Sequence, residues 1–213
     1  MMPITNAEQF ANYAAEHNCV LSPVQIQQIA ALAQWLTTRA PPLGLSKYQN
    51  LSVGLTSALA PVLALFDLLD PASLERVMDL GAGSGALGFT LAIVQPHLTV
   101  DLVDRSTKTA TFLELTIQHL GLDNVQILQA EAAGLHTTYA SRYDIVCFRA
   151  LAPAATALEL AYPFAKDQHY VAAWHQTADS GFENPTGALQ RIDTTPTIIA
   201  GLAVSLYLRK AAD

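Results

Sequence analysis

Short apolar runs alternate with longer segments of helical spacing through the chain after residue 75. Runs of this kind predict buried strands, and apolar residues recurring every three to four positions predict helices. Helices are predicted over residues 85–94, 106–120 and 153–164. The predicted strands are residues 76–80, 98–103, 125–129, 143–149, 169–175 and 203–208. This alternation predicts an α/β fold with a mostly parallel sheet that is covered on both faces.

The first 70 residues follow a different pattern, which is helical throughout. Residues 5–39 are expected to be helical, with Asn6 as one N-cap and Ser22-Pro23 opening a second helix. Residues 51–69 predict a buried helix that is interrupted or restarted at Pro61. We therefore expect two units: residues 1–70 as an N-terminal helical segment packed on the core, and residues 71–213 as the main domain.

A glycine-rich turn follows the first strand of the main domain. Residues 83–88 fit the dinucleotide pattern G-x-G-x-x-G, whereas residues 79–85 fit an acidic-x-G-x-G-x-G pattern like that of S-adenosylmethionine (SAM) enzymes. A carboxylate at the strand end does nothing for a pyrophosphate, but it suits a cofactor that bears an ammonium and a sulfonium. The pattern therefore favours SAM, with Asp79, Gly81, Gly83 and Gly85 as candidate cofactor residues.

Three later strand ends add candidates, because ligands of such sheets bind beyond the carboxyl ends of the strands. Asp104 follows Gly83 by 21 residues, the spacing of a carboxylate that binds ribose hydroxyls. The small residues Ala132 and Ala133 follow the third strand and leave room for an adenine ring. Arg149 ends the fourth strand, where a methyl acceptor would meet the cofactor. Arg105 is expected to pair with Asp104 at the surface.

Composition limits the partners of the chain. The formal net charge is −7 and only 11 residues are Lys or Arg, which argues against a large nucleic-acid footprint but leaves a local basic patch open. No apolar run is long enough for a membrane span, and the N-terminus lacks a signal-peptide pattern. Cys19, Cys147 and the histidines show no metal spacing. We therefore expect a cytoplasmic protein, a monomer with no membrane partner and no metal.

The ordered set of motifs resembles the bacterial small-subunit rRNA guanine-N7 methyltransferases, called RsmG or GidB, over about residues 76–175. The segments that carry the resemblance are Asp79–Gly88 with Ala92-Ile93-Val94-Gln95-Pro96, Leu102-Val103-Asp104 with Lys108 and Phe112-Leu113, Leu122–Val125, and Tyr143–Val146 with Arg149-Ala150. The resemblance implies a Rossmann-like class I SAM-dependent methyltransferase fold. Its sheet is seven-stranded and mostly parallel, and an N-terminal helical appendage precedes it.

The resemblance also assigns roles to residues. Lys108 corresponds to a basic residue near the RNA site of the family. The positions that correspond to cofactor contacts are Gly81, Gly83, Ala86, Asp104, Ala132, Ala133 and Arg149. Some basic positions of the family are changed here: Thr109, Glu131 and Trp174-His175 stand in their places.

The leading hypothesis is a SAM-dependent methyltransferase that acts on small-subunit rRNA. In it Asp104 binds the ribose, the glycine turn holds the methionine end, and Arg149 is the catalytic candidate that orients cofactor or acceptor. Guanine N7 carries a free lone pair, so this methyl transfer needs no general base. Two alternatives stay open: a SAM-binding paralogue without rRNA methylation, and a small-molecule methyltransferase.

Overall fold

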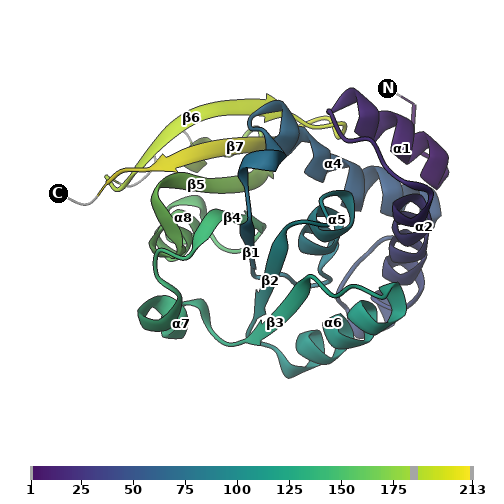
Figure 1. The fold of residues 1–213 in the computed structure, drawn as a ribbon, viewed down its shortest axis with the longest axis horizontal. Helices are drawn as coiled ribbons and strands as arrows, with labels where there is room; N and C mark the ends of the chain where they lie inside the picture. Colours follow the sequence, from purple (N-terminus) through teal and green to yellow (C-terminus); the bar gives the residue numbers. More distant parts are fainter. Residues whose placement is uncertain (1, 183–186, 212–213) are drawn as a thin grey trace.

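The computed structural model describes residues 2–182 and 187–211, which form helices around one central sheet (Figure 1). The strands are β1 (Arg76–Leu80), β2 (Thr99–Asp104), β3 (Val125–Gln129), β4 (Tyr143–Arg149), β5 (Ala165–Gln176), β6 (Leu189–Pro196) and β7 (Leu202–Arg209). The helices are α1 (Ala7–Glu16), α2 (Pro23–Thr38), α3 (Leu51–Val53), α4 (Ala60–Leu63), α5 (Ala86–Val94), α6 (Thr107–Leu120), α7 (Ala132–Tyr139) and α8 (Ala154–Ala161).

The sheet has seven strands in the order β3-β2-β1-β4-β5-β7-β6. The pairs from β3 to β5 are parallel, whereas β7 runs antiparallel to both β5 and β6. This confirms the predicted α/β class and the mostly parallel seven-stranded sheet. The chain order reverses direction between β1 and β4, so the carboxyl ends of these strands form a topological switch point, where open α/β sheets bind their ligands.

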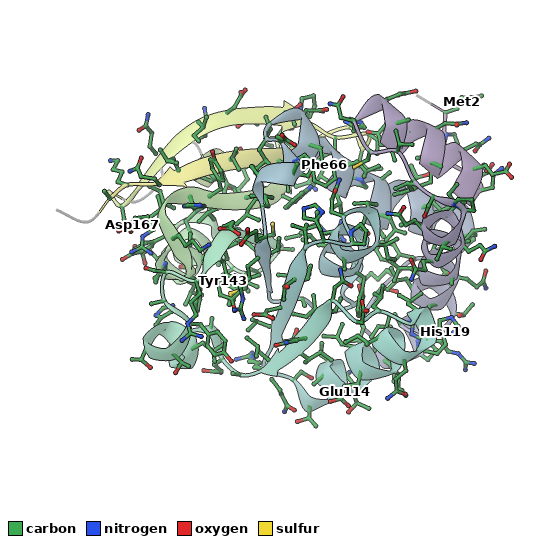
Figure 2. The ribbon with its side chains drawn as sticks, viewed as in Figure 1. Met2, Phe66, Glu114, His119, Tyr143 and Asp167 are labelled. Carbon is green, nitrogen blue, oxygen red and sulfur yellow. The ribbon has the colours of Figure 1, made fainter. Side chains whose placement is uncertain are left out.

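The alternation of side chains along each strand divides the core into two layers. Val77 of β1 belongs to the layer under α1, α2, α5 and α6, while Met78 belongs to the layer under α7 and α8. Helix α5 is buried along its whole length, because the sheet lies on one side of it and the N-terminal helices on the other. Tyr143 lies inside the molecule at the start of β4, whereas Glu114 and Asp167 lie at its periphery (Figure 2).

The N-terminal helices begin with the caps that the sequence predicts. The Asn6 side chain accepts a hydrogen bond from Gln9 N at 2.9 Å, and Ser22 forms a capping box with Gln25. Two glutamines of α2 then cap other helices, because the last carbonyls of a helix lack partners of their own. Gln25 Nε2 donates to Ile93 O at 2.7 Å and Gln28 Nε2 donates to Leu120 O at 3.0 Å. One core layer therefore runs through both predicted units.

The segment 51–69 is buried as predicted, but it is not one α-helix. It passes through α3, a π-helical turn (Gly54–Leu59), α4 and a 3-10 turn (Ala64–Asp67). Pro61 has no N–H, so it cannot bond to the carbonyl of Ser57 one helical turn earlier, and the regular ladder is interrupted there. The carbonyl of Ser57 therefore lacks this intrahelical donor, and the carbonyls of Ser57 and Ala58 both lie within hydrogen-bond distance of Arg149 Nη1.

Two elements are missing from the sequence prediction, and one strand is longer than predicted. Strand β6 has a mostly exposed burial pattern, so it lacks the apolar alternation that signals a strand. Helix α7 has no fully buried residue and its sequence of small residues reads as a loop. The predicted strand 169–175 begins earlier, at Ala165, because it pairs with the start of β4. In the described parts of the chain, no helix is long and apolar enough to cross a membrane.

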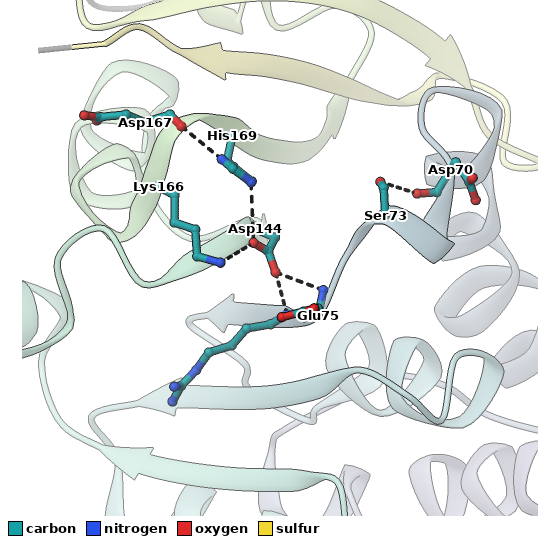
Figure 3. Close-up of polar contacts among 8 residues, drawn as sticks. Asp70, Ser73, Glu75, Asp144, Lys166, Asp167 and His169 are labelled. Carbon is teal, nitrogen blue, oxygen red and sulfur yellow. Dashed lines mark hydrogen bonds and ion pairs between the residues drawn. The ribbon is translucent and has the colours of Figure 1, made fainter.

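Asp144 ties the entry of β1 to β4 and β5 (Figure 3). The residue is 4% exposed, and its Oδ2 accepts hydrogen bonds from the backbone N of Glu75 at 2.9 Å and of Arg76 at 2.8 Å. Its Oδ1 pairs with Lys166 Nζ at 2.6 Å. Burial favours the protonated carboxyl, but the bonds from Lys166, Arg76 and Glu75 outweigh it and hold the pKa of Asp144 below its usual value.

Asp144→Asn is expected to lower the free energy of unfolding by about 1–3 kcal/mol near neutral pH, because it removes a charged acceptor from three donors. A carboxyl whose folded pKa is lowered stabilises the fold above the unfolded pKa of about 4, and this contribution disappears as pH falls through the folded value. Urea titrations at about pH 7 and about pH 3 should therefore show a difference that shrinks in acid. An equal difference in unfolding free energy between the wild type and Asp144→Asn at both pH values would contradict this. Asp123→Asn is the control, because Asp123 is an exposed aspartate in the turn before β3.

Candidate functional site

The glycine turn joins the end of β1 to the start of α5. The backbone N of Gly81 and of Ala82 both donate to Val103 O of β2 at 2.9 Å, which holds the turn against the neighbouring strand. Gly81 has φ +75° and Gly85 has φ +73°, conformations that side chains disfavour. A Cβ on Gly85 would also lie 2.4 Å from the ring of Phe89. The turn therefore requires glycine at these positions.

Asp104 connects the turn to the next strand-helix junction. Its Oδ2 accepts from Gly83 N at 3.0 Å and its Oδ1 accepts from Ser106 N at 2.9 Å. Ser106 in turn caps α6 through its side chain. Each carboxylate oxygen carries a second lone pair, so Asp104 can still accept hydrogen bonds from a ligand bound beside it.

A cavity of about 450 Å³ lies beyond the carboxyl ends of β1, β2 and β3, and we call it the first cavity. This size falls within the range of small-molecule and cofactor sites. Its walls are mostly apolar, with small residues after β3 and the Asp104 carboxylate as a polar group. The lining residues are Leu80, Gly81, Val103, Asp104, Arg105, Ala130, Glu131, Ala132, Ala133, Ala150, Leu151 and Leu160. Four of the predicted cofactor residues therefore meet at one cavity.

The ion pair at the rim differs from the expected one. Arg105 Nη1 contacts Glu131 Oε1 at 3.1 Å, with both side chains mostly exposed. The prediction that Arg105 pairs with Asp104 was wrong, because the two Asp104 oxygens face the glycine turn and α6 instead. An exposed pair of this kind contributes little to stability.

Asp79 lies behind the glycine turn. It is 2% exposed and its Oδ2 accepts from Gly88 N in the first turn of α5 at 2.9 Å. Burial raises the pKa of Asp79 to about 7, although the Gly88 amide and the charge of Arg149 act in the opposite direction. Its predicted contact with a cofactor stays a prediction, since its carboxylate is not part of the first cavity wall. The other motif residues Gly83, Gly85 and Ala86 shape the turn and the start of α5.

Arg149 ends β4 and reaches the N-terminal segment. Its Nη2 donates to Tyr48 Oη at 3.0 Å, and its Nη1 lies 3.3 Å from Ala58 O and 3.5 Å from Ser57 O. These are the carbonyls next to the break at Pro61. The predicted catalytic role of Arg149 stays a prediction, and in this structure its guanidinium holds the N-terminal segment against the sheet.

A second cavity of about 440 Å³ lies next to the first, beyond the ends of β4 and β5. The two cavities share Ala150 and Leu151 in their walls. Ala150 has φ +54°, a left-handed conformation that costs a non-glycine residue about 1–2 kcal/mol. Such strain gathers at functional sites. The other lining residues are Ser57, Phe148, Arg149, Ala152, Trp174, His175, Gln176, Asp179, Phe182, Ile199 and Leu202.

Sequence reasoning missed most of the second cavity. His175 lies near the end of β5, where the resemblance marks only a changed basic position. Asp179 and Phe182 come from the segment after β5, where no motif or spacing marks them. Ser57 is further away in the sequence and is brought there by the packing of the N-terminal segment. The signal that could have found them is the general rule that ligands of such sheets bind beyond the carboxyl ends of the strands, which applies to the end of β5 as well.

Lys108 lines neither of the two cavities. Its Nζ donates to Leu43 O at 2.7 Å and so connects the first turn of α6 to the loop after α2. Its predicted role as a substrate residue stays a prediction. Within residues 2–182 and 187–211, no group of three or more His, Cys, Asp or Glu side chains could hold a metal ion.

Comparisons with known proteins point in one direction. The family model described as GidB, rRNA small subunit methyltransferase G, matches residues 25–183. The ribosomal RNA small subunit methyltransferase G of Lactobacillus helveticus (strain DPC 4571) is 32% identical over 174 residues, which are 79% of this chain and 72% of that protein. A protein of the same name from Thermoanaerobacter sp. (strain X514) is 34% identical over 121 residues, which are 55% of this chain and 50% of that protein.

The fold has solved relatives as well. A putative methyltransferase yhhF from Escherichia coli superposes with a TM-score of 0.57 at 18% identity, over 71% of this chain and 86% of that one. At this level of identity the likeness concerns the fold alone.

The buried Asp79 carboxyl generates a pH prediction for the ligand-free protein. Its folded pKa of about 7 exceeds the unfolded value of about 4, so the folded state binds an extra proton between these values. Stability should therefore fall as pH rises through this window, with a slope of up to about 1.4 kcal/mol per pH unit from this group.

Urea unfolding at several pH values from about 4 to about 8 measures this slope. Asp79→Asn should remove it, and the exposed Asp123→Asn should leave it in place. Parallel curves for the wild type and Asp79→Asn would show that Asp79 titrates normally.

Proposed function

The chain belongs to the GidB family, described as rRNA small subunit methyltransferase G, and from this premise we propose that it transfers a methyl group from SAM to small-subunit rRNA. The observation that carries the proposal is the first cavity. A carboxylate at the end of β2, a glycine turn after β1 and small residues after β3 meet there. The match covers half of one relative's length, so the activity, substrate and partners of the whole protein are inferred.

The residues of the first cavity fit SAM. Asp104 has free acceptor capacity toward the cavity and suits the two ribose hydroxyls. Ala132 and Ala133 at the start of α7 leave space for a flat adenine ring, and the turn around Gly81 lies at the methionine end. SAM supplies an electrophilic methyl group when bound, so the protein's task is to bind, orient and exclude water.

The second cavity is the place for the acceptor base, because it adjoins the first at Ala150 and Leu151. Guanine N7, the acceptor that the family resemblance implies, attacks with its own lone pair and needs no proton removed. Holding the base close and in line with the methyl group therefore supplies most of the acceleration. Arg149 contributes by fixing the cavity wall formed by the segment around Ser57.

The charge of the chain limits how it meets RNA. Phosphate contacts rely on Lys and Arg, but the net charge is −7, and Lys108 and Arg149 both bond to the chain itself. This favours recognition through the shape and the bases of a structured rRNA target. The same observation is what supports the alternative of a SAM-binding paralogue without rRNA methylation. We infer a cytoplasmic protein, since rRNA is the proposed partner, and we propose that it acts as a monomer.

Asp104→Asn is expected to weaken binding of S-adenosylhomocysteine about 10- to 100-fold, since a charged hydrogen-bond acceptor is lost. Isothermal titration calorimetry measures this, with Asp123→Asn as a control that keeps wild-type affinity. Asp104 also holds the glycine turn, so a second comparison isolates the ribose contact. The wild type should bind a 2′-deoxyribose analogue of S-adenosylhomocysteine more weakly than S-adenosylhomocysteine itself. Asp104→Asn should bind the two ligands with nearly the same affinity, because its ribose contact is already lost. If the deoxyribose analogue lowered affinity by the same factor in both proteins, Asp104 would not contact the ribose.

Deleting the gene is expected to remove one methyl group from a guanine of small-subunit rRNA, and re-expression should restore it. Mass spectrometry of nuclease digests of the rRNA measures the modified nucleoside. The Asp104→Asn chain should restore less methylation than the Asp123→Asn chain. Unchanged guanine methylation in the deletion strain, together with intact binding of S-adenosylhomocysteine, would favour the non-methylating paralogue.

A further inference from the structure

The second cavity combines an aromatic stack with one carboxylate. The rings of His175 and Phe182 are stacked, with centroids 4.3 Å apart and planes at 21°. Phe182 is 4% exposed, whereas His175 is half-buried, so the imidazole is the more accessible part of the stack. Proteins that read unstacked bases use flat rings of this kind, His included, and select among bases by hydrogen bonds to the base edge.

The hydrogen bonds of His175 hold its ring in place and occupy both nitrogens. Its Nδ1 lies 2.9 Å from Gln176 O, which can only accept, so Nδ1 carries a proton. Its Nε2 lies 2.8 Å from Ser205 Oγ, which in turn lies 2.7 Å from Thr194 Oγ1. These bonds orient the ring as a platform, and they leave selection among bases to another group.

Asp179 is the carboxylate that lines this cavity. It is exposed, and its Oδ1 accepts from Gly181 N at 3.2 Å, which fixes the side chain in the turn after β5. An ionised carboxylate only accepts hydrogen bonds and has about four lone-pair sites, so the remaining sites are available to a ligand. The group therefore selects a partner that presents donors.

Guanine is the nucleobase that presents two adjacent donors, N1–H and N2–H₂, on its Watson–Crick edge. Adenine presents a donor beside an acceptor on that edge, and the acceptor would face the carboxylate. N7 of guanine lies on the opposite side of the purine, so a base held by this edge leaves N7 free. We propose that Asp179 is the specificity-determining residue of the acceptor site and pairs with the Watson–Crick edge of guanine. This inference rests on the proposed function.

The test compares guanine with hypoxanthine, which keeps N1–H and N7 but lacks the N2 amino group. Small-subunit rRNA with either base at the methylated position is the acceptor, and kcat/KM for methyl transfer is measured. The wild type should prefer guanine about tenfold or more, since a lost charged hydrogen bond typically costs that much. Asp179→Asn should lose about 10- to 100-fold on guanine and bring the ratio of the two bases close to one.

Three controls isolate the base edge. Asp123→Asn should keep both the rate and the preference for guanine. Asp179→Ala should lose the preference as Asp179→Asn does, which separates a lost acceptor from a misplaced amide. Binding of S-adenosylhomocysteine should be unchanged in each variant, since Asp179 does not line the first cavity. A guanine-to-hypoxanthine ratio that stays at the wild-type value in Asp179→Asn and Asp179→Ala would overturn the inference.

A binding measurement separates failure of this inference from failure of the proposed function. If the wild type transfers no methyl group to rRNA, the proposed function fails, and the cavity is then tested directly. Guanosine monophosphate and inosine monophosphate are titrated into protein saturated with S-adenosylhomocysteine. Tighter binding of the guanine nucleotide that is lost in Asp179→Asn supports the inference. Equal binding of the two nucleotides by the wild type overturns it.

Discussion

The hydrogen bonds of one carboxylate organise the carboxyl edge of the sheet. Asp104 accepts from Gly83 N in the turn after β1 and from Ser106 N at the start of α6. A single side chain thereby fixes two neighbouring strand-helix junctions relative to each other. Because the backbone N–H groups of a tight turn need partners when they leave the sheet, this bond both satisfies the turn and shapes the first cavity. The two carboxylate oxygens of Asp104 thus hold the turn in place, and in our proposal the same oxygens bind the ligand.

A missing N–H in the N-terminal segment shapes the second cavity. Pro61 cannot bond to Ser57 O, and the carbonyls near the break face Arg149 at the end of β4. The indole Nε1 of Trp174 at the end of β5 donates to Pro61 O at 2.8 Å. Strands β4 and β5 are thus bonded to the N-terminal segment, and Ser57 becomes part of the cavity wall. This supports our proposal that residues 1–70 pack on the main domain and take part in its acceptor site.

The charged groups around the site comprise a buried carboxylate, Asp79, and two groups that line the cavities, Asp104 and Arg149. Arg149 lowers the pKa of the buried Asp79, while burial and the charge of Asp104 raise it. Asp104, nearer the solvent, lines the first cavity, and Arg149 lines the second. An ammonium group of a bound ligand near the glycine turn would favour the ionised form of Asp79 as well.

The sequence by itself determined the class of the fold and four of the residues that line the first cavity, Gly81, Asp104, Ala132 and Ala133, because these depend on local patterns. Apolar runs fix the parallel strands, and glycine spacing with Asp104 marks the turn that must follow β1. Only the tertiary structure decided the second cavity. Ser57 and Asp179 are separated by a long stretch of chain, and no local pattern records that they meet each other and Arg149 at one cavity. The exposed β6 escaped prediction for a related reason: its pairing with β7 comes from backbone hydrogen bonds, which depend little on the type of side chain.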